Sequence, residues 1–140
     1  LRDAELGVPV LLETNGVFAD RIESILSWID IVSMDVKLPS NSGEPPQWNE
    51  HAEFLRRSRS KTVYVKVPVD EKTHDDEFER AAQLVAEVDR RMPFFIQPIL
   101  SPTAELEVTG PRLREFYDRA TRHLEDVRVL PQAHRFLGIA

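Results

Sequence analysis

Three residues that could bind a charged ligand, Ser33, Asp35 and Lys37, occupy every second position of the stretch VSMDVKLPS. Side chains two residues apart point to the same face of a β-strand. A hydroxyl, a carboxylate and an ammonium group on one face can hydrogen-bond a polar ligand, and the lysine can pair with an anion. The pattern therefore predicts a strand with a polar face, which is either only hydrated or the floor of a binding site.

Polar residues also lie at the ends of the other strand-like runs. VPVLLET is followed by the turn residues Asn15 and Gly16, TVYVKVPVD contains Lys66, FFIQPIL contains Gln97, and VRVLP leads to His134. These runs predict strands over residues 8–14, 30–38, 62–70, 94–100 and 127–131. Apolar residues at helical spacing predict helices over 18–29, 48–58, 75–91 and from 111 onward, with Thr73 as the N-cap of the third and SNSGEPP (40–46) as a loop.

Alternation of strands and helices predicts an α/β fold with a parallel sheet and right-handed crossovers. The sheet could be open and doubly wound or an arc of a (β/α) barrel, and either places a ligand site at the C-terminal ends of the strands. Strands covered on both faces should be almost entirely apolar, so polar rows on several strands need a polar space to face. An exposed sheet face or buried ion pairs would explain the same rows.

Composition restricts the class of protein. The chain has 140 residues, a formal net charge of −6 and no cysteine, which argues against a nucleic-acid or anionic-membrane partner and excludes a disulfide framework. No apolar run approaches the length of a membrane span, and the lack of cysteine fits a cytoplasmic protein, which we expect. Leu1 is not an initiator methionine and LRDAELG resembles a helix end, so we expect residues 1–140 to be part of a larger domain.

The histidines show no metal-ligand spacing. His51, His74 and His123 lie on predicted helices or at their ends, and each is expected to be a surface residue. His134 follows the last strand, where it is either a ligand contact or a half-buried structural residue. The sequence contains no dinucleotide-binding glycine motif, no P-loop and no nucleophile elbow, and it identifies neither a catalytic residue nor a metal ligand.

Four segments, LLETNG, VSMDVKLPS, FFIQPIL and the ending VLPQAHRFLGIA, together resemble the 7-carboxy-7-deazaguanine synthases. These are radical S-adenosylmethionine enzymes of queuosine and deazapurine biosynthesis. The TNG turn and the D-x-K strand also occur in glycyl-radical-enzyme activating enzymes, whereas the ending is typical of the synthases. The resemblance covers nearly the whole chain.

The resemblance implies an incomplete parallel (β/α) barrel of the radical S-adenosylmethionine type, about five strands of which are present. It implies a carbon–nitrogen lyase that rearranges 6-carboxy-5,6,7,8-tetrahydropterin with loss of ammonia, using S-adenosylmethionine, a [4Fe–4S] cluster and magnesium. The family's cluster cysteines and Gly-Gly-Glu-Pro motif lie on earlier strands, and this sequence has neither. SGEP at 42–45 comes too late in the order and is interpreted as a loop. The chain thus resembles the C-terminal two thirds of such an enzyme and should be inactive alone.

The same resemblance assigns candidate site residues. Ser33 and Lys37 should approach the carboxylate and ribose of S-adenosylmethionine, with Asp35 in the same row. Gln97 should help to hold the nucleoside. Thr14 and Asn15 match the TNG turn, and either could face inward. His134 and the terminal residue Ala140 match positions that contact the pterin.

Two alternatives remain open at the level of sequence. One is a glycyl-radical-enzyme activating enzyme, and the other is a truncated, non-catalytic binding or dimerisation module. We also expect Ser33, Lys37, Lys66 and Gln97 on one concave side of the sheet. An apolar edge strand over residues 8–14 predicts self-association, most simply as a homodimer.

Overall fold

The computed structural model describes residues 7–103 and 105–131. Its strands form one sheet in the order β1-β2-β3-β4-β5, and every neighbouring pair is parallel. The strands are β1 (Leu11–Thr14), β2 (Ile31–Asp35), β3 (Thr62–Val69), β4 (Phe94–Pro98) and β5 (Val127–Val129). The predicted α/β fold, parallel pairing and sequential order are confirmed.

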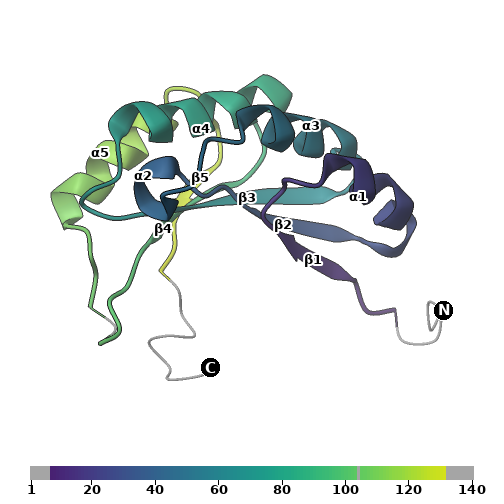
Figure 1. Cartoon of the computed structure of the whole chain (residues 1–140), viewed down its shortest axis with the longest axis horizontal. Coiled ribbons are helices and arrows are strands. Elements are labelled where there is room, and N and C mark those ends of the chain that lie inside the picture. The colour runs from purple at the N-terminus through teal and green to yellow at the C-terminus, as the bar shows by residue number, and fades with distance from the viewer. Residues whose placement is uncertain (1–6, 104, 132–140) are drawn as a thin grey trace.

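A helical segment follows each of the first four strands. The helices are α1 (Ala19–Ile25), which runs into a 3₁₀ turn (Leu26–Trp28), α2 (Pro39–Ser42), α3 (Trp48–Ser58), α4 (Asp75–Val88) and α5 (Gly110–Ala120). Figure 1 shows α1, α3, α4 and α5 together on the convex face of a curved sheet, with the concave face free of helices. A doubly wound sheet carries helices on both faces, so the described part of the chain does not have that arrangement.

The core lies between the convex face and the helices, because buried and accessible side chains alternate along β3 and β4. On β3 the four valines, Val63 to Val69 at every second position, are between 0 and 6% exposed, whereas the residues between them are partly accessible. Each buried valine contributes roughly 1.5 kcal/mol or more by leaving water. Phe78 of α4 joins the layers through edge contacts with Phe94 of β4, at 5.9 Å between ring centroids, and through Phe116 of α5, at 4.6 Å.

Two local predictions were wrong. His74 rather than Thr73 precedes α4, and no side chain caps that helix. The Thr73 hydroxyl instead accepts from the backbone N–H of Asp70 at 2.9 Å and closes the β3–α4 turn. The predicted loop over 40–46 contains most of a one-turn helix, α2, which begins at Pro39 and ends at Ser42, and Gly43 caps it with a left-handed φ of +71°.

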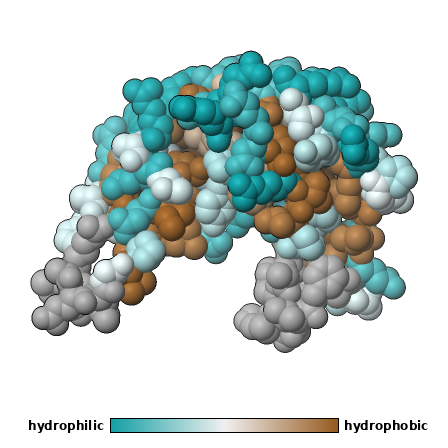
Figure 2. Space-filling view, turned by 180° about the vertical axis from the view of Figure 1, so that it is seen from behind, coloured by the Kyte–Doolittle hydropathy of each residue, from teal (hydrophilic) through white to brown (hydrophobic). Residues whose placement is uncertain are grey.

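The edge of β1 that faces away from β2, together with the segment just before β1, has no partner strand among the described residues. Val8, Val10 and Leu11 are exposed by 70, 43 and 48%, and Figure 2 shows hydrophobic surface along this lower rim beneath a largely hydrophilic helical layer. The predicted open edge is therefore present. Within the described residues, no helix combines the length and apolar character that crossing a bilayer requires.

Candidate functional site

The pairing register brings the predicted polar residues onto the concave face. Ser33 pairs with Tyr64, Asp35 with Lys66, and Pro68 with Gln97, and residues paired in a parallel ladder share a face. The backbone N–H of Val36 donates to the Lys66 carbonyl at 2.9 Å, and the Val36 side chain is buried in the core. Lys37 follows the end of β2, and it lines a cavity together with Pro68, the ladder partner of Gln97.

An ion cluster centred on Lys66 occupies the middle of this face. The Lys66 ammonium lies 2.9 Å from Oδ1 of Asp35 and 3.3 Å from Oε1 of Glu13, and the Lys66 side chain is 18% exposed. Burial by itself would lower the pKa of Lys66, but the close contact with Asp35 and Glu13 and their negative charges outweigh it, so this pKa is raised. Lys66 therefore stays charged and neutralises part of the acidic pair.

Two oxygen atoms beside this cluster lack an aligned hydrogen bond among the described residues. Ser33 is fully buried and its hydroxyl has no partner. Oδ1 of Asp35 has only the ion pair with Lys66, whose 2.9 Å separation does not have hydrogen-bond geometry. Buried polar atoms are normally satisfied, so these two mark a place where a polar ligand or water would complete the structure.

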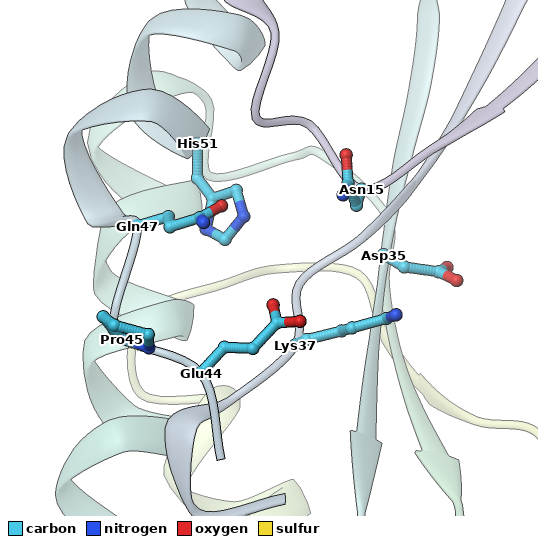
Figure 3. A pocket seen from close by; sticks show the side chains of 7 residues that line it. All are labelled: Asn15, Asp35, Lys37, Glu44, Pro45, Gln47 and His51. Atoms are coloured by element: carbon cyan, nitrogen blue, oxygen red, sulfur yellow. The ribbon is translucent and has the colours of Figure 1, made fainter. Parts of the chain in front are cut away.

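A pocket opens where β2 ends, between the β1–α1 turn and the first turn of α3. Figure 3 shows Glu44, His51 and Asn15 arranged around it. Lys37 is exposed and forms no ion pair with any residue in the described ranges. A free ammonium beside amide groups suits a ligand that carries an anionic group. The pocket is lined by Asn15, Asp35, Lys37, Glu44, Pro45, Gln47 and His51.

The TNG turn is shaped by Gly16 and capped by Thr14. Gly16 has φ +68°, and a Cβ atom there would lie 2.7 Å from Sδ of Met34, so both the conformation and the space require glycine. Thr14 pairs with Met34 and faces the helical layer, where its hydroxyl accepts from the N–H of Gly16 at 3.1 Å. Asn15 is exposed and lines the pocket. Of these two candidates, Asn15 is the one that reaches the pocket.

His51 is not a surface residue, contrary to the sequence-based prediction. Its side chain lies under the first turn of α3 and is only 3% exposed. Burial lowers the pKa of His51, although the Asn15 backbone carbonyl and the charge of Glu50 act in the opposite direction. The misreading arose because polar residues surround His51 in the sequence, while the helix turns it inward beside Ala52 and Leu55. His74 is exposed as predicted, and His123 is half-buried against Glu79 at 2.9 Å.

Gln97 lies on the same face beyond an aromatic pair. Tyr64 and Phe95 meet edge to face with ring centroids 5.4 Å apart, and the Arg128 guanidinium lies 5.5 Å from the Phe95 ring. Phe95 pairs with Lys66 in the ladder, so the aromatic pair adjoins the ion cluster. The concave face thus combines charged groups with flat apolar surface, which a heteroaromatic ligand could use.

Sequence reasoning missed five residues of this region. Glu13 could have been found, because it alternates with Leu12 and Thr14, and its pairing with Ser33 places it on the concave face. The other four, Glu44, Pro45, Gln47 and His51, lie in or after the loop that follows β2, and only the folded chain brings them to the end of that strand. Residues 132–140 lie outside the described residues, and the predicted substrate contacts His134 and Ala140 are among them. Within the described ranges no three His, Asp or Glu residues form a group that could hold a metal ion.

Comparison with curated proteins gives four matches, all named 7-carboxy-7-deazaguanine synthase. The Geobacter sulfurreducens protein is 37% identical over 131 residues, which are 94% of this chain and 52% of the relative. The Methanopyrus kandleri protein is 34% identical over 137 residues, 95% of this chain and 50% of the relative. The chain is therefore similar to the 7-carboxy-7-deazaguanine synthases. The resemblance seen in its motifs is confirmed.

The chain spans 50–59% of the length of these synthases, a smaller share than the two thirds predicted. None of the four names is that of a glycyl-radical-enzyme activating enzyme, so the comparison favours the synthases over that alternative. No protein-family profile matches the chain. No solved structure matches it either.

Proposed function

We propose that this chain is part of a 7-carboxy-7-deazaguanine synthase of queuosine and deazapurine biosynthesis. The complete enzyme would convert 6-carboxy-5,6,7,8-tetrahydropterin to 7-carboxy-7-deazaguanine with loss of ammonia. The observation that carries the proposal is similarity to such synthases across 92–95% of the chain. The pocket that joins Asn15, Asp35 and Lys37 supports it, because these residues come from the TNG and D-x-K segments behind the resemblance.

The fold supports a partial barrel of the radical S-adenosylmethionine type. A curved parallel sheet in sequential order, with helices only on its convex face, is the arrangement of a barrel arc. The concave face would then form the barrel interior. The accessible edge of β1 is where further strands of a larger barrel would pair. In this proposal the site lies at the C-terminal ends of the strands, as in other parallel α/β enzymes.

The residues around the pocket fit S-adenosylmethionine. The Lys37 ammonium, which has no ion pair among the described residues, would bind the carboxylate of its methionine part, and the Asn15 amide would hydrogen-bond a neighbouring polar group. The buried Ser33 hydroxyl has no partner within residues 7–103 and 105–131, and with Gln97 it would contact the ribose and the base. When bound, S-adenosylmethionine supplies the radical that starts the rearrangement. The chain's own part is to hold and orient this cofactor over the concave face.

This chain does not fit the other two groups that the family uses. It contains no cysteine to hold a [4Fe–4S] cluster, and its described residues form no group of metal ligands. We therefore derive no step at the cluster or at magnesium from the residues of this chain. Their ligands would lie outside the chain, and the 140 residues alone would be inactive. His134 and Ala140 remain our candidates for contacting the pterin substrate.

The remaining properties in this proposal follow from charge and surface. A net charge of −6 disfavours a nucleic-acid partner. We propose a cytoplasmic homodimer that acts on a small molecule and does not bind a membrane. A non-catalytic module is the remaining alternative. Both are tested by incubating the full-length polypeptide that carries this chain, reconstituted with iron and sulfide, with the pterin, S-adenosylmethionine and a reductant. The synthase forms 7-carboxy-7-deazaguanine, detected by mass spectrometry, and a module forms none.

A further inference from the structure

The α2 loop (residues 39–46) carries part of the pocket wall, and little apolar packing holds it in place. Residues 39–46 are all at least partly accessible, and 42–46 are exposed. Helix α2 itself has only four residues, and a helix of that length is not stable through its own hydrogen bonds. The position of the loop therefore depends on the polar contacts that it makes with the rest of the chain.

Hydrogen bonds connect α2 to the start of α4, which lies beside it in Figure 1. The backbone N–H of Ser40 donates to Oε2 of Glu77 at 2.8 Å, and the backbone N–H of His74 donates to the Ser40 hydroxyl at 3.2 Å. The Ser40 N–H belongs to the first turn of α2, where N–H groups have no partner inside the helix. The contact with Glu77 is the stronger of the two, because a carboxylate acceptor gives a shorter and stronger hydrogen bond than a hydroxyl.

Glu77 makes this contact instead of one that its own helix could use. It is the third residue of α4, and a glutamate at that position commonly accepts from the backbone N–H of the residue before the helix. Here that N–H, of His74, donates to Ser40, while the Glu77 carboxylate accepts from α2. The stability of α4 alone does not require this exchange. The Glu77 side chain, which is 18% exposed, therefore serves the α2 loop.

The α2 loop lines two cavities that share Lys37. Asn41, Ser42 and Glu44 line a cavity of about 310 Å³ whose wall also includes Lys37 and Pro68. Glu44 and Lys37 also line the pocket in Figure 3. Nδ2 of Asn41 is buried and has no hydrogen-bond partner among the described residues, so a polar ligand or water would complete it. A shift of the loop would change the surroundings of the Lys37 ammonium in both cavities.

We propose that Glu77 is a positioning residue, which holds the α2 loop against α4 through the Ser40 N–H and thereby fixes the pocket wall beside Lys37. The proposal rests on the proposed function, because the ligand positioned in this way is S-adenosylmethionine. Glu77 is not among the residues that line either cavity, so it acts through the loop and does not touch the ligand. Because coupling between two sites is reciprocal, bound S-adenosylmethionine should in turn stabilise the hydrogen bond between Ser40 and Glu77.

Three substitutions on α4 separate positioning from stability. Glu77→Ala removes the acceptor of the Ser40 N–H, and Glu77→Gln keeps a carbonyl oxygen that can accept it. Glu79→Ala is the matched control, because it removes the same charge two residues along but breaks contacts with Arg119 and His123 rather than with the loop. S-adenosylmethionine binding to the full-length protein is measured by calorimetry at pH 7.5. Hydrogen exchange at the Ser40 amide is followed with and without ligand, and urea unfolding shows whether each variant is folded.

Glu77→Ala should bind about tenfold more weakly than wild type, a loss of about 1.4 kcal/mol, and its Ser40 amide should exchange faster. Glu77→Gln should bind within about threefold of wild type. Glu79→Ala should lose stability but bind as wild type does. In the wild-type protein the ligand should slow exchange at the Ser40 amide, and this measurement does not depend on the folding of any variant.

Equal affinities of Glu77→Ala and wild type, or equal losses of affinity in Glu77→Ala and Glu79→Ala, would overturn the positioning role alone. A Glu77→Gln variant that binds as weakly as Glu77→Ala would also overturn it, as would a Ser40 amide that the ligand does not protect in the wild-type protein. Absence of S-adenosylmethionine binding by the wild-type protein would overturn the proposed function and this role together.

Discussion

Replacing Gly16 by alanine should destabilise the protein through two separate effects. The backbone has φ +68°, where a residue other than glycine costs about 1 kcal/mol. A Cβ atom would also lie 2.7 Å from Sδ of Met34, whose side chain is fully buried, and overpacking of this kind costs about 1–3 kcal/mol. Together the expected loss is about 2–4 kcal/mol, a large part of the typical stability of a domain.

Gly43→Ala is the matched control. Gly43 has nearly the same backbone conformation, φ +71°, but a Cβ atom there meets nothing within 4 Å. It should therefore lose only the conformational part, about 1 kcal/mol. Urea unfolding followed by circular dichroism measures both variants against wild type. Equal losses in the two variants would refute the claim that contact with Met34 makes Gly16 necessary in the TNG turn.

Three further predictions concern other parts of the structure. Lys66→Met removes the cation between Asp35 and Glu13 and should lower the free energy of unfolding by about 1–3 kcal/mol. The control Lys61→Met, just before β3, should change this free energy little, and urea unfolding compares the two variants. The exposed β1 edge should cause concentration-dependent self-association in sedimentation experiments, and Leu11→Lys should reduce it; a monomer at high micromolar concentration would contradict this. The hydrogen bond from His123, together with Arg119, lowers the pKa of Glu79, so the stability it contributes is present above the ordinary value of 4.5 and is lost as the pH falls through the lowered value. Glu79→Gln should flatten that part of the acid-unfolding curve.

The strands and their order could be predicted because period-two alternation is a local property. The valines of β3 and the alternation of Ser33 and Asp35 with apolar neighbours both specify which side chains face the helices. Once strands and helices alternate, parallel pairing follows from the connections. The predicted ends of helices and strands were less accurate, because local hydrogen bonds decide where each element ends. Helix α4 ends at Val88 rather than Arg91, and the turn before it recruits Thr73.

The pocket was only partly predictable. Asn15, Asp35 and Lys37 lie at strand ends, which parallel strands bring to one edge of the sheet. Glu44 and His51 could not be assigned to it, because their positions depend on the path of the chain after Lys37. Pro39 and Gly43, which bound α2, are equally typical of a loop, and no local signal shows that α3 turns His51 inward. The face of the sheet on which Thr14 lies could be assigned only from the pairing of β1 with β2.

Binding of S-adenosylmethionine to Lys37→Met tests the central claim most directly. If the pocket at the end of β2 holds the cofactor carboxylate, losing the ammonium removes a charge-assisted hydrogen bond of about 1.5–3 kcal/mol, and affinity should fall at least about tenfold. Lys61→Met is the control, since Lys61 lies before β3 at the opposite end of the sheet and should leave binding unchanged. Calorimetry on the full-length protein should show this difference. Equal affinity in both variants and wild type would contradict the assignment of this pocket.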